Sequence, residues 1–499
     1  MLNTLVKAYL QVFDRQLSDI KNYSPDLQRD QLKKIGHSPY FKHFFSGRNP
    51  GSFENHDSFI QEFDISGYGT YAQKVEGLFD PESPLKVPYF AQSSGTSGER
   101  KLLPVSELFV RQNLLRGTWY VLNTLYTHKS RMSVFRFKNL LIGGAIYDYS
   151  KSRTVADISG IMLSRIPWYM RSHYVPSVDV ATSPNWREKI ELTAQAASRT
   201  RNISLLGGTP TWVLSAIKRV LQLTNTEKIS DVWPHLECYI HGGVHFKPYM
   251  EQFEQLIDID SFLYLEVYNA TEGFFAFQDD PNEDGLLLMT DNGIYYEFIP
   301  LKDYYEGSSK SVQLEQVELG VNYVLVISSI MGLIRYEVGD VVQFTSRQPY
   351  RITVCGRTTE YINAFGEDLL LNQVLSALEA VNQKHKCSIF NFTVAPKYIS
   401  VDEKGRHDWY VEFDKQPPCI NDFSRDLDLA IQKENINYRQ KRSEDLAITS
   451  LKLTPLDTGF YEDFLDCNDR LGGQSKIQKL RNDRKLADPI ETHLKKFEL

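Results

Sequence analysis

The chain has 499 residues, of which 42% are hydrophobic and 12% aromatic, enough apolar material for more than one folded domain. Its formal net charge is −7, and the basic residues are scattered among acidic ones rather than gathered in a stripe, which argues against nucleic-acid binding. The 5 cysteines form no C-x-x-C pair and have no metal-ligand spacing, so we expect a reducing, cytoplasmic setting.

The first 70 residues are predicted to be mostly helical, because apolar residues recur at helical spacing in LVKAYLQVF and DSFIQEF. Lys7 interrupts the first of these stretches, and Asp14 and Arg15 follow it directly, so it lacks the continuous apolar core of a signal peptide. No segment approaches the run of about 18 uncharged apolar residues that a membrane span needs. We therefore expect no membrane partner.

The stretch SSGTSGERK, residues 93–101, combines four hydroxyl side chains, two glycines and a lysine. Glycines let successive N–H groups converge on one point, and the hydroxyls and the ammonium add donors, which favours an anion site. A polar surface turn is the alternative, since Ser, Thr and Gly are common turn residues. The spacing excludes a Walker loop, because only two residues separate Gly95 from Gly98.

Helical and short extended segments alternate between this stretch and residue 285, which predicts α/β layers. ELFVRQNLLRGTWYVLNTLY is typical of a helix and KNLLIGGAIYDY of a strand that leads into a turn. TWVLSAIKRVLQLTN predicts a helix capped by Thr209 or Thr211. Residues 285–355 are rich in β-branched and aromatic side chains, which predicts a β-rich subdomain with a hairpin turn at Asp-Asn-Gly.

The C-terminal part contains one helical pattern in LLLNQVLSALEAVNQ, strand-like FNFTVAP and DWYVEFD, and a second helical pattern near RDLDLAIQKENINYRQKR. These segments suffice for a small α+β domain. We expect a large N-terminal domain over residues 1–356, a hinge over 357–366 and a small C-terminal domain over 367–499. The predicted fold class is α/β, with a β-rich subdomain in the large domain and a small α+β domain after it.

Polar residues follow apolar runs at two further places. LEVYNATEGFFAF puts Tyr268, Thr271 and Glu272 after a strand-like stretch, where the carboxylate either holds Mg²⁺ beside phosphates or is a solvated turn residue. RYEVGDVV puts Asp340 behind a glycine, where it either accepts hydrogen bonds from ribose hydroxyls or lies in an ordinary Gly-Asp turn.

Three more segments carry candidate residues with open alternatives. Arg357 in CGRTTEYINAFGEDL is either a ligand contact or a linker charge. Lys476 in RLGGQSKIQKLRND lies beyond a Gly-Gly turn, in a basic segment that could equally be a solvated face. In YIHGGVHF, His241 and His245 have the spacing of a helical zinc site, but the glycines between them disfavour a helix, so we expect no metal there.

In order and spacing these segments resemble the signatures of the adenylate-forming superfamily: [ST]-S-G-[ST]-[ST]-G-x-x-K, Y-x-x-T-E, Y-x-x-G-D and G-R-x-x-[DE]-x-I-x-x-x-G. All four occur here in that order. YYEFIP at 295–300, GLIRYEVGD at 332–340 and LGGQSKIQKL near the end narrow the resemblance to the Gretchen Hagen three (auxin-responsive) family of acyl-acid amido synthetases. The resemblance covers nearly the whole chain.

The resemblance implies a large domain that binds ATP, Mg²⁺ and a carboxylic acid, and a small mobile domain that rotates between two half-reactions. The first would make an acyl-adenylate and pyrophosphate, and the second would transfer the acyl group to an amine, an amino acid in this family, with release of AMP. An acyl-CoA synthetase and a catalytically silent nucleotide sensor are the alternatives, and the GGQSK motif favours amide over thioester. The oligomeric state stays open, a monomer included.

The resemblance also implies roles for single residues on the phosphate side. Glu272 would be the Mg²⁺-associated carboxylate, Lys101 would contact the phosphates, and Lys476 would meet the α-phosphate during adenylation. The phosphate loop itself would consist of Ser93, Ser94, Gly95, Thr96, Ser97 and Gly98.

On the nucleoside side, the resemblance implies that Tyr268 stacks on adenine beside Thr271. Asp340 and Arg357 would bind the ribose. The adenine pocket would be lined by Gly242 and Gly243.

Two positions depart from the family pattern. Asp368 stands where many members have a lysine, and Gln478 with Lys479 replaces a Pro-Arg pair. The aromatic side chains of residues 166–175 and 207–214 suggest a flat or apolar acid substrate.

Overall fold

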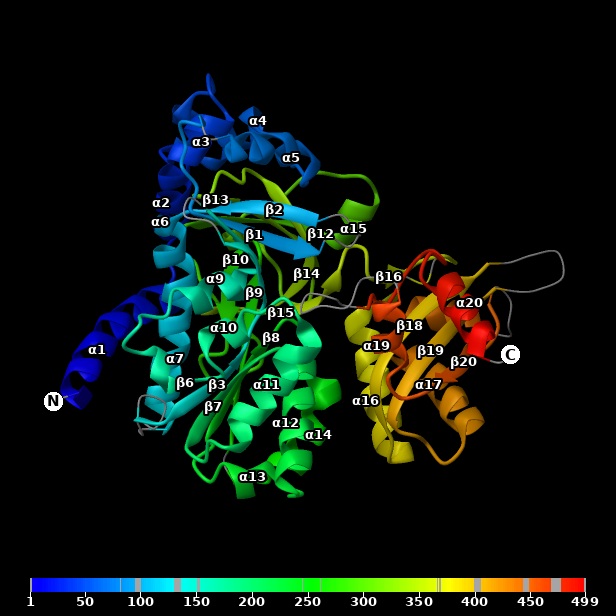
Figure 1. Cartoon of the computed structure of the whole chain (residues 1–499). Coiled ribbons are helices and arrows are strands. Elements are labelled where there is room, and N and C mark those ends of the chain that lie inside the picture. Colours follow the sequence, from blue (N-terminus) through cyan, green and yellow to red (C-terminus); the bar gives the residue numbers. More distant parts are fainter. Residues whose placement is uncertain are drawn as a thin grey trace. The chain divides into compact units, whose positions relative to one another are not determined.

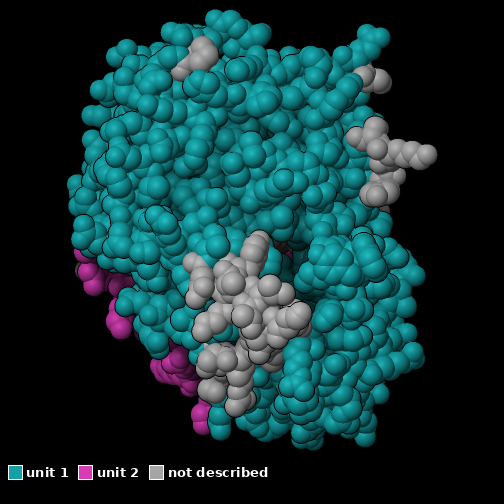
Figure 2. Space-filling view, turned by 90° about the vertical axis from the view of Figure 1, so that its left-hand side faces the viewer, with its two compact units in different colours: residues 1–244, 252–354 teal, residues 245–251, 355–499 magenta. Residues whose placement is uncertain are grey.

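The computed structural model describes residues 2–80, 82–94, 100–129, 136–149, 153–244, 246–260, 262–365, 367, 369–398, 405–442, 448–467 and 477–497. The chain forms two compact units, Met1–Val244 with Gln252–Val354 and His245–Glu251 with Cys355–Leu499, coloured separately in Figure 2. The sequence did not indicate that residues 245–251 group with the second unit. The predicted hinge over residues 357–366 stays a prediction.

The N-terminal region is helical, as predicted. Its elements are α1 (Leu2–Lys21), α2 (Pro25–Gly36), α3 (Pro39–Phe44), the 3-10 helix η1 (Pro50–Glu54), α4 (His56–Glu62), α5 (Gly69–Glu76) and the 3-10 helix η2 (Gly77–Phe79). Serine caps explain where α2 and α3 begin: Ser38 Oγ, for example, accepts a hydrogen bond of 3.0 Å from the N–H of Phe41, and proline occupies the first turn of both helices. Phenylalanine rings pack between these helices, with 4.6 Å between the centroids of Phe41 and Phe53.

The first unit is built on a sheet of 11 strands in the order β12-β13-β14-β15-β11-β10-β9-β8-β7-β3-β6. The parallel half consists of β3 (Lys138–Ile142), β6 (Tyr174–Val175), β7 (Ile203–Gly208), β8 (Cys238–Gly242) and β9 (Leu263–Ala270). The other half consists of β10 (Gly273–Phe277), β11 (Leu286–Leu288), β12 (Ile294–Pro300), β13 (Asn322–Ser329), β14 (Tyr336–Arg347) and β15 (Tyr350–Arg357). The predicted β-rich region supplies this half, and the sheet changes from parallel to antiparallel pairing between β9 and β10.

Helices cover the sheet, as α/β layering requires (Figure 1). On the parallel half, α11 (Trp186–Ser198) and α12 (Pro210–Thr224) pack against each other and against β6 and β7. The predicted helix that begins near residue 209 is α12; Thr209 occupies its N-cap position, but the Thr209 side chain makes no capping hydrogen bond. The other helices of the first unit are α6 (Glu107–Phe109), the π-helix η3 (Val110–Leu115), α7 (Arg116–Lys129), α9 (Ile158–Ser164), α10 (Val178–Ala181), α13 (Ile229–Val232) and α15 (Leu301–Tyr305). The helix α14 (Lys247–Ile257) is divided between the two units, since its residues up to Glu251 group with the second.

The predicted Asp-Asn-Gly hairpin is wrong. The turn joins β11 to β12, but β11 pairs with β10 and β15, whereas β12 pairs with β13 at the edge of the sheet. Gly293 does adopt the left-handed backbone that such a turn needs, with φ of 80°. Its N–H is held by Gln31 Oε1 of α2 at 3.0 Å, so a helix rather than a partner strand fixes the turn.

A smaller sheet of 4 strands has the order β2-β1-β5-β4, with β1 (Tyr89–Ser94), β2 (Arg100–Val105), β4 (Ile146–Tyr149) and β5 (Thr154–Ala156). The strand β4 lies where the sequence predicted only a turn. Strands β1 and β2 are antiparallel, and Ser94 lies opposite Arg100. The predicted anion loop is therefore the connection of a β-hairpin, and residues 95–99 lie outside the described residues.

The second unit is an α+β domain, as predicted. Its sheet, β18-β19-β20, separates two hydrophobic clusters: Trp409 and Val411 pack with residues of α16 and α17, whereas Tyr410 packs with residues of α19 and α20. The elements are β16 (Tyr361–Ile362), β17 (Leu369–Leu370), α16 (Leu371–His385), β18 (Ser388–Lys397), β19 (Arg406–Lys415), α17 (Ile420–Glu434), α18 (Ile436–Arg442), β20 (Lys452–Leu456), α19 (Phe460–Asp466) and α20 (Ala487–Phe497). Within the described residues, no helix of either unit is both long and apolar enough to cross a membrane.

A buried ion pair connects the N-terminal helices to the sheet of the first unit. Arg335, just before β14, has a left-handed backbone with φ of 45° and is 5% exposed, and Glu297 of β12 is fully buried. The Nε atom of Arg335 donates to both carboxylate oxygens of Glu297, at 3.1 and 3.2 Å. Its other guanidinium nitrogens donate to the carbonyl of Phe63 at 2.8 Å and to Ser311 Oγ at 2.9 Å. The three groups that accept hydrogen bonds from the buried guanidinium of Arg335 therefore come from three different segments of the chain.

Replacing Arg335 by methionine should lower the free energy of unfolding by about 3–5 kcal/mol, because Glu297 would keep its charge in the interior with only the hydroxyl of Ser311 as a partner among the described residues. Urea denaturation of the full chain, followed by tryptophan fluorescence, measures this loss. The control is Arg48→Met, which breaks an ion pair with Glu62 whose arginine side chain is 56% exposed. The control should change stability by at most about 1 kcal/mol. Equal losses of unfolding free energy in the two variants would contradict the role given to the buried Arg335–Glu297 pair.

Candidate active site

The carboxyl ends of β8 and β9 and the turn to β10 bring several of the predicted site residues together. Ala270 pairs with Gly273, so Thr271 and Glu272 alone form the turn between the two strands. Both side chains are buried. Open α/β sheets bind ligands beyond the carboxyl ends of their parallel strands, where the strand order or direction changes. Glu272 lies at such a place, because β9 is parallel to β8 and antiparallel to β10.

Tyr268 and Asp340, 72 residues apart in the chain, are in direct contact. The hydroxyl of Tyr268 on β9 donates a hydrogen bond of 2.6 Å to Oδ2 of Asp340 on β14, and both side chains are buried. The ring of Tyr268 also packs against Phe275, with 4.9 Å between centroids. A short bond to a carboxylate in a buried place is a strong one, so these two residues hold each other in position.

An irregularity in β14 explains how Asp340 comes to lie there. In the pairing with β13, Val324 lies opposite Val341 and Val326 opposite Glu337, so β14 has extra residues between these two pairs. Gly339 is one of them and has φ of 85°, which favours glycine. Such bulges re-aim side chains that a regular strand would point elsewhere. The glycine before Asp340 is therefore required by the backbone.

Glu272 is contacted by a residue that the sequence did not single out. The hydroxyl of Tyr336, the first residue of β14, donates to Oε1 of Glu272 at 3.4 Å. Tyr336 is almost completely buried, and its ring packs edge-on against Tyr71 of α5, with 5.8 Å between centroids. The sequence did hold a signal for Tyr336, because it is the tyrosine of the Y-x-x-G-D signature that also contains Asp340.

Glycine is needed at both positions at the end of β8, for a different physical reason at each. A Cβ on Gly242 would lie 2.4 Å from the carbonyl oxygen of Val267 on the neighbouring strand, so a larger residue does not fit. Gly243 has a φ of 83°, in the left-handed region. The glycines thus let β8 approach β9 closely and turn sharply at its end; their contact with adenine stays a prediction.

Two ionisable groups beside this glycine pair are shifted by burial. Burial lowers the pKa of His241 on β8 to about 3, so the imidazole is neutral at neutral pH. Burial raises the pKa of Glu266 on β9 to about 7, so this carboxyl group is partly protonated at neutral pH. His241 lies in a strand and not in a helix, and the second histidine of the pattern, His245, lies outside the described residues.

The predicted phosphate loop is described only at its ends. Ser93 and Ser94 end β1, and Gly95, Thr96, Ser97 and Gly98 lie outside the described residues. Lys101 on β2 is half-buried, and its Nζ lies 5.8 Å from the centroid of the Tyr68 ring. The hydroxyl of Tyr68 accepts a hydrogen bond of 2.9 Å from the N–H of Leu102, so Tyr68 contacts the strand that carries Lys101.

In the second unit, Arg357 ends β15 and is half-buried, while Lys476 and Asp368 lie outside the described residues. Lys479, one of the departures from the family pattern, is described. Its Nζ donates to Oδ1 of Asn391, and its backbone N–H donates to Oε1 of Glu360 at 3.2 Å. Burial lowers the pKa of Lys479 to about 8. Lys479 therefore has local partners within its own unit.

Glu272 could hold a magnesium ion only together with ligands that the described residues of the protein do not supply. Among the described residues, no group of three or more His, Cys, Asp or Glu side chains could hold a metal ion by itself. Magnesium in nucleotide sites is usually bound by one or two carboxylates together with phosphate oxygens and water. A single buried carboxylate is thus compatible with a metal that arrives with a nucleotide.

The aromatic residues suggested for the acid pocket are not all buried. Trp168 is 82% exposed and Tyr169 is 64% exposed, and their rings pack edge to face at 5.9 Å. The acid pocket stays a prediction.

Family models and relatives agree on one family. The models "GH3 family N-terminal domain", "GH3 family central domain" and "GH3 family C-terminal domain" match residues 9–194, 287–357 and 372–485. A jasmonoyl-L-amino acid synthetase of Oryza sativa subsp. japonica is 26% identical over 289 residues, which is 52% of this chain and 48% of the relative. A probable indole-3-acetic acid-amido synthetase of Arabidopsis thaliana is 30% identical over 138 residues, 26% of this chain and 22% of the relative. The chain thus spans under half the length of these curated relatives.

Solved structures agree on the fold. An acyl acid amido synthetase in complex with 2,4-DB has a TM-score of 0.76 at 16% identity, with 97% of this chain and 96% of that chain covered. A 2-hydroxyisobutyryl-CoA ligase, solved in a postadenylation state with R3-HIB-AMP, has a TM-score of 0.55 at 11% identity, with 94% and 90% covered. The fold is therefore that of adenylate-forming enzymes. With N-terminal, central and C-terminal models matched in order along most of its length, the chain belongs to the GH3 family.

Proposed function

We propose that this chain is an ATP-dependent acyl-acid amido synthetase, which adenylates a carboxylic acid and transfers the acyl group to an amino acid. The observation that carries the proposal is that β14 contacts two of the predicted site residues where the sheet changes direction: Asp340 bonds to Tyr268, and Tyr336 bonds to Glu272. The amido synthetase relatives support the choice of product, and the likeness to a ligase solved with an acyl-adenylate supports the choice of intermediate.

In the first half-reaction, a carboxylate oxygen of the acid attacks the α-phosphorus of ATP, and the bond to the pyrophosphate oxygen breaks. Asp340, which is bonded to Tyr268, would accept hydrogen bonds from the ribose. Glu272, oriented by Tyr336, is the side chain that would hold Mg²⁺, which supplies positive charge to the phosphates when bound. Lys101 on β2 and the hairpin before it would hold the phosphates.

In the second half-reaction, the amine nitrogen attacks the acyl carbon, the C–O bond to AMP breaks, and the amine proton passes to solvent. Adenylation is needed because a free carboxylate has a poor leaving group, whereas AMP leaves readily. Lys476 would act in the first half-reaction only, where negative charge builds up at the α-phosphate. This division of labour requires the small domain to move between the two steps.

Two other functions remain distinguishable. An acyl-CoA synthetase would share the adenylate and pass the acyl group to a thiol. A nucleotide sensor would bind ATP without turnover, but Lys476 would supply a charge that serves the adenylation step and is not needed for binding alone. A cytoplasmic location stays a prediction.

Purified protein with Mg²⁺ and ATP should release pyrophosphate with at least one acid from a panel of aromatic, indolic and fatty acids. With that acid, amino acids should yield an amide and coenzyme A no thioester, as read by mass spectrometry. EDTA should abolish both signals, because the phosphate charge would lack its counter-ion. A thioester would identify an acyl-CoA synthetase, and tight ATP binding without any pyrophosphate would identify a sensor.

The variant Tyr268→Phe should raise the KM for ATP on the order of 10-fold and lower the melting temperature by only a few degrees. The lost hydroxyl bonds to a carboxylate, a contact worth about 1.5–3 kcal/mol, and Asp340 would no longer be held for the ribose. Steady-state kinetics at saturating acid measure the effect. Tyr398→Phe, which removes the hydroxyl of an exposed tyrosine outside the proposed site residues, is the matched control and should behave like wild type. An unchanged KM in both variants would remove Asp340 from the proposed ribose site.

Replacing Lys476 by alanine should slow adenylate formation by on the order of 10²–10³, because one donor to the transition state is lost. Amide formation from a pre-made acyl-adenylate should stay near the wild-type rate. Lys101→Ala should instead weaken ATP binding, since that lysine would hold the ground-state phosphates. Lys485→Ala is the control, because its side chain is 81% exposed in the same C-terminal segment. Equal losses in both half-reactions for Lys476→Ala would mean that it stabilises the small domain.

A further inference from the structure

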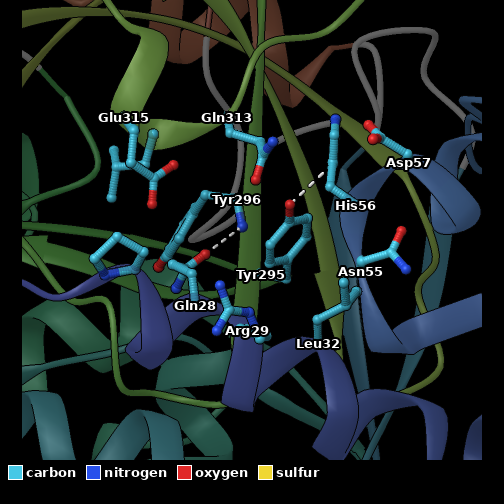
Figure 3. A pocket seen from close by; sticks show the side chains of 12 residues that line it. Gln28, Arg29, Leu32, Asn55, His56, Asp57, Tyr295, Tyr296, Gln313 and Glu315 are labelled. Carbon is cyan, nitrogen blue, oxygen red and sulfur yellow. Dashed lines mark hydrogen bonds between the residues drawn. The ribbon is translucent and has the colours of Figure 1, made fainter.

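A pocket of the first unit, of about 250 Å³, contains none of the proposed nucleotide-binding residues. Four segments form it: the first turns of α2, the residues before and at the start of α4, the strand β12, and the 3-10 helix η5 (Leu314–Gln316) (Figure 3). Its size suits a small metabolite better than a nucleotide or a peptide, since pockets for drug-sized ligands are about 300–1,000 Å³.

The pocket has rigid walls. Tyr295 and Tyr296 on β12 are 3% and 1% exposed, and the hydroxyl of Tyr295 is bonded to Nδ1 of His56 at 3.0 Å. The N–H of Tyr296 donates to Oε1 of Gln28 at 2.8 Å, and Nε2 of Gln28 donates to the carbonyl of Thr290 at 2.9 Å. Because these contacts hold the lining side chains in place, little ordering would be needed for binding.

The charges around the pocket have both signs, on different walls. Arg29 comes from α2, where its guanidinium also pairs with Asp26 at 2.6 Å, whereas Asp57 comes from the first turn of α4 and Glu315 from η5 (Figure 3). Burial lowers the pKa of His56, so the imidazole is neutral at neutral pH and adds no positive charge. Oε1 of Glu315 accepts a hydrogen bond of 2.7 Å from the hydroxyl of Tyr23, which fixes that carboxylate at the edge of the pocket.

These charges exclude simple ions. A lone anion would face the carboxylates of Asp57 and Glu315, and a lone cation would face the guanidinium of Arg29. A molecule that carries an ammonium and a carboxylate satisfies both, with the ammonium toward Glu315 and the carboxylate toward Arg29, since Asp57 lies on the opposite side of the pocket from Glu315 (Figure 3). The apolar side chain of such a molecule would contact the tyrosine rings of the lining and its two leucines, Leu32 and Leu314.

We propose that this pocket binds a free α-amino acid with an apolar side chain, as a zwitterion. The proposal does not depend on the proposed function, because the pocket shares no residue with the nucleotide-binding set. It adds an amino-acid site to any at which the acyl acceptor would bind.

Isothermal titration calorimetry of the full chain, without ATP or acid, tests the proposal with L-leucine as the probe. L-Leucine amide lacks the carboxylate, and N-acetyl-L-leucine lacks the ammonium. Each analogue should bind at least about tenfold more weakly than L-leucine, the equivalent of about 1.4 kcal/mol for one lost charge-assisted contact. Arg29→Gln and Glu315→Gln should each weaken L-leucine binding by a similar factor, because each removes one charge and keeps a polar side chain.

Matched controls are Lys34→Gln on α2 and Glu318→Gln beyond η5, which change exposed charges outside the pocket and should leave binding unchanged. Undiminished binding in Arg29→Gln and Glu315→Gln would overturn the proposal, because the heat would then come from another site, such as that of an acyl acceptor. Equal affinity for L-leucine and its singly charged analogues, or no saturable heat at millimolar concentration, would also overturn it. Because no ATP is used, a failure of pyrophosphate release would count against the proposed function alone.

Discussion

The buried ion pair between Glu297 and Arg335 is the contact on which the first unit most depends. It joins β12 to the residue that leads into β14, and it also binds the carbonyl of Phe63 between the N-terminal helices. A charge in the protein interior is tolerated only when its partners are complete, so the left-handed backbone of Arg335 is held by the same set of contacts. The next residue, Tyr336, therefore begins β14 in one defined position.

The candidate active site follows from that position. Tyr336 reaches Glu272, and the irregular pairing of β14 with β13 then brings Asp340 to Tyr268. Both tyrosine hydroxyls donate to carboxylates, so each acid is oriented before any nucleotide arrives. Pre-oriented polar groups are what catalysis of a charged transition state requires, because no reorganisation is then needed during the reaction.

The first unit has two polar regions with different chemistry. The face near Glu272 and Asp340 is acidic and lies at the change of strand direction, which suits a nucleotide that brings its own magnesium. The pocket between α2 and β12 has charges of both signs and rigid aromatic walls, which suits a small zwitterion. Both regions border strands joined to the Glu297–Arg335 pair, since Tyr295 and Tyr296 directly precede Glu297 on β12.

The sequence by itself determined the helical N-terminal region, the helices α12 and α16, and the α+β character of the second unit, because helical periodicity and capping are local properties of the chain. The order of the four signatures also sufficed to indicate the family and most candidate site residues. Only the tertiary structure decided which strands are neighbours: β11 and β12 are fully buried runs that suit several partners, so the predicted hairpin between them was wrong. For the same reason the contacts of Glu272 with Tyr336, of Tyr268 with Asp340 and of Glu297 with Arg335 could not be predicted. Pairing between residues distant in the chain depends on register and bulges, which no local pattern encodes.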